Sequence, residues 1–267
     1  MFSKLFALRG ELPKKVSWVI EISGFLFLLS IWALLTELKV LPGSLLPSPF
    51  KVLSSFSELH YEDALIRELF FSIKINVYGY IEAILFSIPV GFVIALFPLF
   101  REMLRRYVDA IRFLPLTALT GLFIAWFGIG TDMKVQFLAF GISVYLIPVV
   151  IQRITEVEQV YCDTLYTLGG NNWKIIRHVF IPDVLSKIID DCRILTAISW
   201  TYIIVAELLN KSDGGIGSLA YTSARQGRVD KVFAILLIII LVGFIQDKII
   251  SYLALILFPH KRVKGEK

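Results

Sequence analysis

The chain has 267 residues, of which 57% are hydrophobic and 18% charged, and its formal net charge at neutral pH is +5. Soluble domains usually contain about 45–50% apolar and about 25% charged residues. An ordinary water-soluble domain is therefore excluded, as are a disordered chain and a small disulfide-stabilised module. The composition predicts a polytopic membrane protein. We attribute the basic excess to Lys and Arg on the cytoplasmic side of the membrane, in preference to nucleic-acid binding.

Six segments are long and apolar enough to cross a bilayer as helices, which takes about 20 mostly apolar residues. In chain order they cover residues 18–36, 75–100, 111–127, 135–151, 184–209 and 232–246, and a segment predicted to lie on the membrane surface follows at 249–258. The basic residues before the first segment give it some likeness to a signal peptide. Because the segment is longer than a signal-peptide core and no small-residue cleavage site follows, an uncleaved first span is predicted.

The predicted organisation is all-α, with an N-terminal arm, a single transmembrane domain that includes one long cytoplasmic loop, and a short tail. Their bounds are residues 1–17 for the arm, 18–258 for the domain, 155–182 for the loop and 259–267 for the tail. Six spans place both termini on one side of the membrane. The connections on that side carry about twice as many Lys and Arg residues as those opposite, which predicts that both termini are cytoplasmic.

The long cytoplasmic loop is too polar to enter lipid. We expect residues 155–168 to form one helix, which Gly169 and Gly170 end because glycine tolerates the left-handed conformation that terminates helices. Asn171 or Asn172 is then placed to cap a second short helix by accepting a backbone N–H bond. The sequence predicts a helix–turn–helix at the inner membrane surface.

The loop resembles the EAA loop of the membrane permease subunits of bacterial ATP-binding-cassette importers. In that loop Glu-Ala-Ala is followed after three residues by Gly, and after nine more by Ile-x-Leu-Pro. The matching positions here, with the same spacing, are Asp163-Thr164-Leu165, Gly169, Val179, Ile181 and Pro182. Pro182 also marks the expected start of the fifth span. Further segments that resemble the nitrate, sulfonate and taurine group of this family are residues 46–49, 112–130, 206–209 and 214–217.

The resemblance implies the MetI-like, six-helix fold of a type I importer permease in the bacterial inner membrane. It implies pairing with a second permease, which is a copy of this chain or a relative, docking of two cytoplasmic ATPases, and delivery of solute by an external binding protein. ATP would be bound by the partner ATPases, so this chain would need no cofactor; lipid would surround it, and nucleic acid is not among its partners. The group's solutes include nitrate, bicarbonate, sulfonates, taurine and vitamin precursors. The residues that the resemblance assigns to ATPase coupling are Asp163, Gly169, Gly170, Asn171, Trp173, Ile181 and Pro182.

Two ionisable residues lie inside apolar spans, where such groups usually face a cavity or a partner. Glu82 is predicted either to line a translocation path or to hydrogen-bond to another helix. Glu207 lies near the outer end of its span, so we expect it to reach water. The glycine-rich turn at residues 214–217 is interpreted as a connector in preference to a gate. The full set of candidate path residues is Glu82, Pro115, Thr117, Ser199 and Glu207.

A membrane-embedded enzyme acting on lipid or peptide is the alternative function. Such an enzyme needs clustered acid–base groups or metal ligands, yet the chain contains no HExxH or DxxD motif. Asp190 and Asp191 point about 100° apart on a helix, and we expect both to lie in water beside Lys187 and Arg193. Trp126 is interpreted as a packing or interface residue and not as part of an aromatic cage.

Nucleotide hydrolysis is not predicted for this chain. A phosphate-binding loop needs Gly-x-x-x-x-Gly-Lys followed by Ser or Thr, because its backbone N–H groups cradle the phosphates. That pattern does not occur in the sequence, and the residue directly before Lys174, where the pattern requires its second glycine, is Trp173. The sequence therefore predicts no catalytic residue and no metal site.

Overall fold

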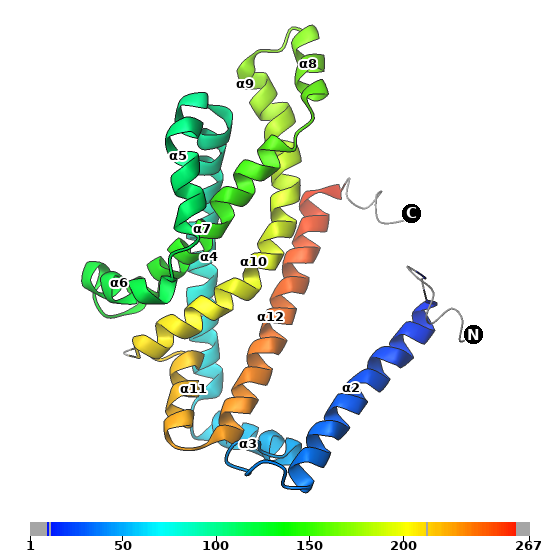
Figure 1. Ribbon diagram of the computed structural model, residues 1–267, viewed down its shortest axis with the longest axis vertical. Coiled ribbons are helices and arrows are strands. Elements are labelled where there is room, and N and C mark those ends of the chain that lie inside the picture. The colour runs from blue at the N-terminus through cyan, green and yellow to red at the C-terminus, as the bar shows by residue number, and fades with distance from the viewer. Residues whose placement is uncertain (1–9, 11, 212, 260–267) are drawn as a thin grey trace. The chain divides into compact units, whose positions relative to one another are not determined.

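The computed structural model describes residues 10, 12–211 and 213–259, which form helices joined by short connections, with no strand among them (Figure 1). The predicted arm at 1–17 and tail at 259–267 lie mostly outside the described residues. The helices are α2 (Lys14–Glu37), α3 (Pro49–Tyr61), α4 (Leu65–Leu96), α5 (Pro98–Ile111), the 3-10 turn η1 (Leu116–Leu119), α6 (Thr120–Phe127), α7 (Thr131–Thr155), α8 (Gln159–Thr167), α9 (Asn172–Ile175), the π turn η2 (Ile176–Phe180), α10 (Ile181–Leu209), α11 (Ile216–Arg225) and α12 (Val229–Leu257).

Five helices are long and apolar enough to cross a membrane, namely α2, α4, α7, the continuous helix Asn172–Leu209 and α12. They contain five of the six predicted spans, and the all-helical fold class is confirmed. Two predicted boundaries differ. Pro98 starts α5, so α4 ends at Leu96 and does not run on to residue 100. At the other end of the chain, α12 continues to Leu257, so residues 249–257 belong to the same helix as the sixth span.

The third predicted span, residues 111–127, is not one helix. α5 ends at Ile111, and its axis makes an angle of 95° with that of the segment Leu116–Phe127. Pro115 lies at the break, where its ring and its missing N–H prevent a helix from continuing through it. A sixth span is present when this bent pair is counted as one crossing.

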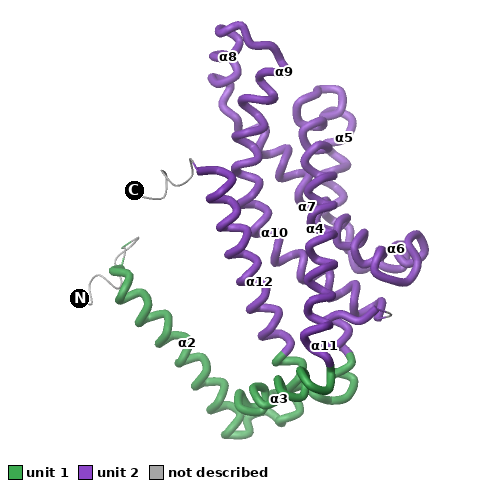
Figure 2. The backbone as a smooth tube through the Cα atoms, turned by 180° about the vertical axis from the view of Figure 1, so that it is seen from behind, with its two compact units in different colours: residues 1–63, 222–234 green, residues 64–221, 235–267 purple. Residues whose placement is uncertain are grey.

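The described chain divides into two compact units, shown in Figure 2: residues 1–63 with 222–234, and residues 64–221 with 235–267. In the first unit, Ser48 caps α3 by accepting a hydrogen bond from the N–H of Lys51 at 3.3 Å. Arg228 joins α3 to the start of α12, since its guanidinium lies 2.7 Å from Glu58 and 2.8 Å from Asp230. Hydrogen bonding to Arg228 lowers the pKa of the Glu58 carboxyl.

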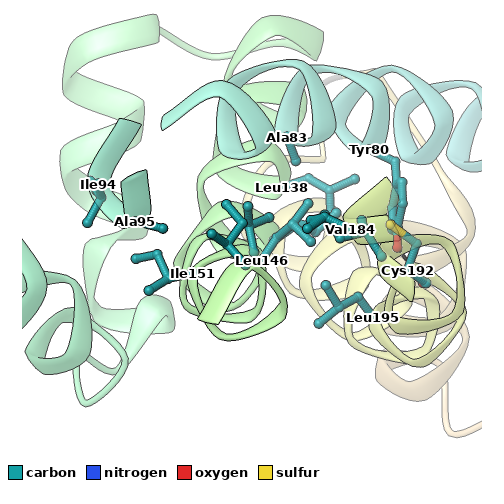
Figure 3. Close-up of a cluster of buried hydrophobic side chains, with 14 residues drawn as sticks. Tyr80, Ala83, Ile94, Ala95, Leu138, Leu146, Ile151, Val184, Cys192 and Leu195 are labelled. Atoms are coloured by element: carbon teal, nitrogen blue, oxygen red, sulfur yellow. Dashed lines mark hydrogen bonds between the residues drawn. The ribbon is translucent and has the colours of Figure 1, made fainter. Parts of the chain in front are cut away.

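The core of the second unit lies where α4, α7 and α10 meet, and Figure 3 shows side chains from these helices pointing toward one another. Small residues allow α4 and α7 to approach closely. A Cβ atom at Gly91 would lie 2.5 Å from Cγ1 of Val150, and one at Gly79 would lie 2.9 Å from Cδ2 of Leu138. Tyr80 of α4 donates a hydrogen bond to the backbone carbonyl of Cys192 in α10. Close packing and hydrogen bonds between helices thus fix this part of the molecule.

Candidate functional site

The first helix of the loop at residues 155–182 is shorter than predicted. The structure ends α7 at Thr155 and begins α8 at Gln159, so residues 155–168 are not one helix. The break is stabilised locally, because Arg153 donates a hydrogen bond to Glu156 at 2.8 Å and thereby lowers the pKa of that carboxyl. Glu158 has extended backbone angles and forms the N-terminal boundary of α8. The fourth span and the loop helix are therefore separate elements.

The reversal between α8 and α9 has the glycine geometry that the sequence predicts. Gly169 has φ = +76°, a left-handed conformation that costs other residues about 1–3 kcal/mol. Its N–H donates to the carbonyl of Tyr166 at 2.9 Å, and the N–H of Gly170 donates to that of Leu165 at 2.8 Å. A Cβ at Gly170 would lie 2.7 Å from the same Leu165 carbonyl oxygen. Both glycines are thus needed, the first for its conformation and the second for its close approach.

The second loop helix begins with two asparagines that have different roles. Asn171 caps α9, since its Oδ1 accepts a hydrogen bond from the N–H of Lys174 at 2.9 Å. Asn172 instead accepts a bond from the Tyr166 hydroxyl at 2.6 Å, which ties α9 to α8. Trp173 follows with 65% of its surface exposed. The turn therefore presents a large, rigid aromatic side chain to the outside of the chain.

The loop does not end where the sequence predicts. Pro182 was expected to start a new helix, but α9, η2 and α10 form one continuous helix from Asn172 to Leu209, 38 residues long. The π turn η2 makes this possible. In it the N–H of Ile181 donates to the carbonyl of Ile176, five residues earlier, so the hydrogen-bonding pattern of the helix changes directly before Pro182. Figure 1 shows the loop at one end of this long helix.

Asp163, the residue at the Glu position of the EAA pattern, is held only locally. Its Oδ1 accepts a hydrogen bond from the Gln159 side chain at 3.0 Å, one turn earlier on α8. Beside it, burial raises the pKa of the Cys162 thiol. Cys162 faces a cavity of about 570 Å³ between the loop and the ends of α4, α5 and α7, into which Arg101 and Arg105 also project. The sequence analysis counted these arginines only as evidence for the orientation of the chain in the membrane, so it did not predict the cavity.

Of the acidic pair of α10, Asp190 is exposed as predicted, whereas Asp191 is not in water. Asp191 is buried and receives two hydrogen bonds from the Arg153 guanidinium, at 2.7 and 2.8 Å, which fasten α7 to α10. Arg193 pairs with Asp247 of α12 at 2.9 Å. Lys187 pairs with Asp183, one turn earlier on its own helix. Sequence spacing identified the charges but not their partners, because those partners come from distant helices.

The five candidate path residues do not come together at one site. Ser199 is fully buried, and its hydroxyl accepts a hydrogen bond from Asn76 at 3.0 Å between α10 and α4. Pro115 and Thr117 lie exposed in the irregular connection before α6. Glu82 is exposed and accepts a hydrogen bond from Gln136 of α7 at 2.7 Å. One of the two roles predicted for Glu82, a hydrogen bond between helices, is therefore present.

Glu207 does not reach water. It is 0% exposed, and it accepts hydrogen bonds from the Ser72 hydroxyl at 2.6 Å and from the N–H of Gly217 at 2.8 Å. The glycine-rich turn closes around this carboxylate, and the N–H of Gly215 donates to Glu68 at 2.6 Å. The sequence interpretation failed because closeness to a helix end was taken as closeness to solvent.

A buried lysine completes this group, which we call the outer cluster: Glu68, Ser72, Lys134, Glu207 and residues 214–217. Lys134 is 0% exposed, and its ammonium donates to the carbonyl of Gly214 at 3.0 Å. The outer cluster joins α4, α7, α10 and the start of α11. The turn is therefore more than a simple connector, and the sequence offered no signal for Lys134, which lies beside the fourth predicted span.

Taken together, the described residues form a multi-pass helical membrane protein with an exposed, capped turn at one end of its longest helix. No group of three or more His, Cys, Asp and Glu side chains that would hold a metal lies within residues 10, 12–211 and 213–259. Residues 87–255 match the family of binding-protein-dependent transport system inner membrane components, and the chain belongs to that family.

Individual relatives agree with this family. The chain is 25% identical over 252 residues to the taurine transport system permease protein TauC of Escherichia coli, covering 92% of this chain and 90% of that one. It is 26% identical over 244 residues to a protein named as the aliphatic sulfonates transport permease SsuC of Bacillus subtilis, covering 90% and 87%. The MetNI methionine ABC transporter in an inward-facing conformation has the same fold, with a TM-score of 0.59, 17% identity and coverage of 70% of this chain and 95% of that one.

The chain is thus the inner-membrane permease subunit of an ATP-binding-cassette importer, and it is not an enzyme. The predicted family, fold class and function are confirmed. Membership of a binding-protein-dependent family implies partners of two kinds, an ATPase and a solute-binding protein. The alternative of a membrane-embedded enzyme is excluded by the same comparisons.

Proposed function

We propose that two permease chains, identical or related, form one translocation path across the bacterial inner membrane and dock two cytoplasmic ATPases through the loop at residues 155–182. A solute-binding protein delivers the solute from outside, and ATP is bound by the ATPases alone. The family to which the chain belongs supports this arrangement. The candidate solutes are taurine and aliphatic sulfonates, which are named for two relatives, together with nitrate, bicarbonate and vitamin precursors.

The observation that carries the coupling role is the exposed Trp173 on a capped turn that continues into a membrane span. A helix of 38 residues is about 57 Å long at 1.5 Å per residue. Motion of an ATPase against Trp173 is therefore transmitted along one rigid element through the bilayer. Closure of the two ATPases would rotate α10 about the path and alternate its access between the two sides. Asp163, Ile181 and Pro182 belong to the same loop and, in this proposal, help to hold its docking surface.

Replacement of Gly169 by valine tests the coupling role. Gly169→Val places a β-branched residue at φ = +76°, which costs about 1–3 kcal/mol and misplaces α9. Gly43→Val is the matched control, because Gly43 has open space around it and no positive φ. We expect both variants to insert normally and only Gly169→Val to lose co-purification of the ATPases and solute-stimulated ATP hydrolysis. Normal coupling in Gly169→Val at normal membrane levels would refute the docking role of the loop.

The proposed orientation, with both termini in the cytoplasm, is tested by labelling with an impermeant thiol reagent. Ser57 and Asn171 are both exposed, and the two native thiols are buried and can be replaced by alanine. In intact spheroplasts, Ser57→Cys should react and Asn171→Cys should not. Permeabilised cells serve as the control, because there both positions should react. Reaction of Asn171→Cys from outside would reverse the assigned topology.

A further inference from the structure

The face of the second unit formed by α4, α6 and α7 contains a cavity of about 340 Å³. This volume is in the range of small-molecule sites, which run from about 300 to 1,000 Å³. Its polar groups include the Glu82 carboxylate and the Gln136 amide, and most of its wall is aromatic. An apolar pocket with a few convergent polar groups is the usual form of a site that binds a small molecule.

The Glu82 carboxylate is only partly satisfied by the protein. Gln136 donates to its Oε2 at 2.7 Å, and within the described residues nothing donates to its Oε1. Glu82 also lies near the middle of the 32-residue helix α4, about 21 Å of helix before its end at Leu96. An ionisable group at that depth is costly in lipid and usually faces a water-filled path or a partner of opposite charge. The Oε1 atom is therefore available to accept a hydrogen bond from an occupant of the cavity.

The aromatic wall is suited to a positively charged or aromatic occupant. The ring of Phe123 is 5.7 Å from those of Trp126 and Phe127 and 5.5 Å from that of Phe140. Trp126, which is 67% exposed, adds an indole to the wall. The faces of such rings attract cations within about 6 Å, and tryptophan does so most strongly.

The cavity has no positively charged side chain that could bind an anion, since none of its lining residues among those described is Lys, Arg or His. Lys134 of α7 is close in sequence to Gln136, but its ammonium is engaged with the carbonyl of Gly214 in the outer cluster. The cavity therefore offers a carboxylate and aromatic faces without a compensating cation. This combination discriminates by charge, since an ammonium group gains both interactions and a sulfonate or carboxylate group gains neither.

We propose that this cavity, which we call the Glu82 pocket, is a contact site on the translocation path for a small solute that carries a protonated amine on an apolar or aromatic body. The amine donates to the free oxygen of Glu82, Gln136 holds the carboxylate in position, and the body of the solute lies against Phe123 and Trp126. This proposal rests on the proposed function, because it assumes that the face of α4, α6 and α7 borders the path. It adds the chemical class that the path selects.

Three aromatic probes of similar size and different charge test the Glu82 pocket: benzylamine, benzyl alcohol and benzenesulfonate. Binding is measured by ligand-observed NMR titration of the permease purified with its ATPases in lipid nanodiscs, without the solute-binding protein. We expect saturable binding of benzylamine, binding of benzyl alcohol at least about tenfold weaker, and no saturable binding of benzenesulfonate. Equal binding of benzylamine and benzyl alcohol would overturn the proposal, because the cavity would then be a purely apolar site for lipid or detergent.

Two matched variants locate the effect. Glu82→Gln keeps the size of the side chain and removes its charge, and it should weaken benzylamine binding at least about tenfold. Glu21→Gln is the control, because Glu21 is also a carboxylate in an apolar helix, where it is paired only with Ser17. It should leave binding unchanged. Unchanged benzylamine binding in Glu82→Gln refutes the pocket.

The same preparations separate this proposal from the proposed function. If the ATPases fail to co-purify with the unmodified chain, the proposed assembly is wrong and the pocket loses its setting. If they co-purify and hydrolyse ATP but benzylamine does not bind, the assembly stands and the Glu82 pocket is refuted. Binding of benzylamine with intact ATPase coupling, lost in Glu82→Gln alone, supports both.

Discussion

The turn in the outer cluster and the turn in the loop at residues 155–182 are stabilised in opposite ways. In the outer cluster, hydrogen bonds join residues far apart in sequence, such as Ser72 and Glu207 with a separation of 135 residues. In the loop, the side-chain bonds are local, and the longest, from Tyr166 to Asn172, joins residues six apart. The outer turn thus takes its shape from several helices, whereas the loop takes its shape from its own chain.

The contrast is between the turn of the outer cluster, which several helices hold in place, and the turn of the loop, whose bonds allow it to move as a unit. Buried charges such as Lys134 and Glu207 are tolerated only with all their partners in place, so displacement of any one helix of the outer cluster is costly. The loop can move together with α10, with which α9 is continuous, without breaking its own bonds, because these lie within residues 159–174. A coupling element needs that property, since it must transmit motion without unfolding.

The sharpest test of the contrast, and the largest expected effect, is removal of the central carboxylate. Glu207→Ala leaves the Ser72 hydroxyl and the Gly217 N–H without an acceptor in a buried site and removes a carboxylate beside the buried Lys134, and it should cost about 3–5 kcal/mol of stability. Thermal unfolding of the detergent-solubilised permease measures this cost. Glu102→Ala, at an exposed position of α5, is the control and should be nearly neutral. If the two variants were equally stable, the hydrogen bonds of the outer cluster would contribute no more to stability than an exposed side chain of α5.

A second prediction addresses the loop side of the comparison. Trp173→Ala should leave thermal stability almost unchanged, because the side chain is exposed, but should weaken ATPase binding by about 2 kcal/mol, or about 30-fold, as expected for a central tryptophan in an interface. Titration of the ATPase against the permease in nanodiscs measures the affinity. Trp18→Ala is matched for residue type and exposure, at 67%, and should have no effect on it. A loss of stability without a loss of affinity would mean that Trp173 supports the fold of this chain and not docking.

The smallest expected effect concerns the bond that joins the two loop helices. Tyr166→Phe removes the hydroxyl that donates to Asn172, and an exposed bond of this kind contributes about 0.5–1 kcal/mol, or at most about a fivefold change in ATPase affinity. Tyr161→Phe on the same helix is the control, because the Tyr161 hydroxyl makes no hydrogen bond within the described residues. If Tyr166→Phe lowered ATPase affinity more than Trp173→Ala does, the turn would be held by this single hydrogen bond and not by its glycines and cap.

The elements that the sequence predicted well are those set by local chemistry. Apolar length located five of the spans, and the conformation of Gly169 and the cap at Asn171 followed from glycine and asparagine preferences alone. The third predicted span is not one straight helix, because Pro115 lies at a break, and it is present as a crossing when the bent pair is counted as one span. The sequence analysis did not predict that α9 continues into α10, because a π turn has no signature in amino-acid composition.

Charged residues inside the membrane domain could be found in the sequence but not paired. Asp191 and Arg153 are 38 residues apart and meet only when α7 and α10 pack together. Glu207 and Ser72 are further apart still, so the burial of Glu207 depends on three helices and a turn. Only for Glu82 did sequence reasoning name the correct kind of contact, because it allowed for a hydrogen bond from a neighbouring helix.

The π turn before Pro182 has a consequence for the direction in which the loop faces. A π turn inserts one residue into an α-helix, and each residue of an α-helix advances its side chains by about 100° around the axis. The angular position of Trp173 around the axis, relative to the membrane-spanning part of α10, is therefore set by η2. Deletion of one residue there would turn the proposed docking surface by about a quarter of a circle. In a related chain with an uninterrupted α-helix at this point, the residue that corresponds to Trp173 would point in a different direction around the same span.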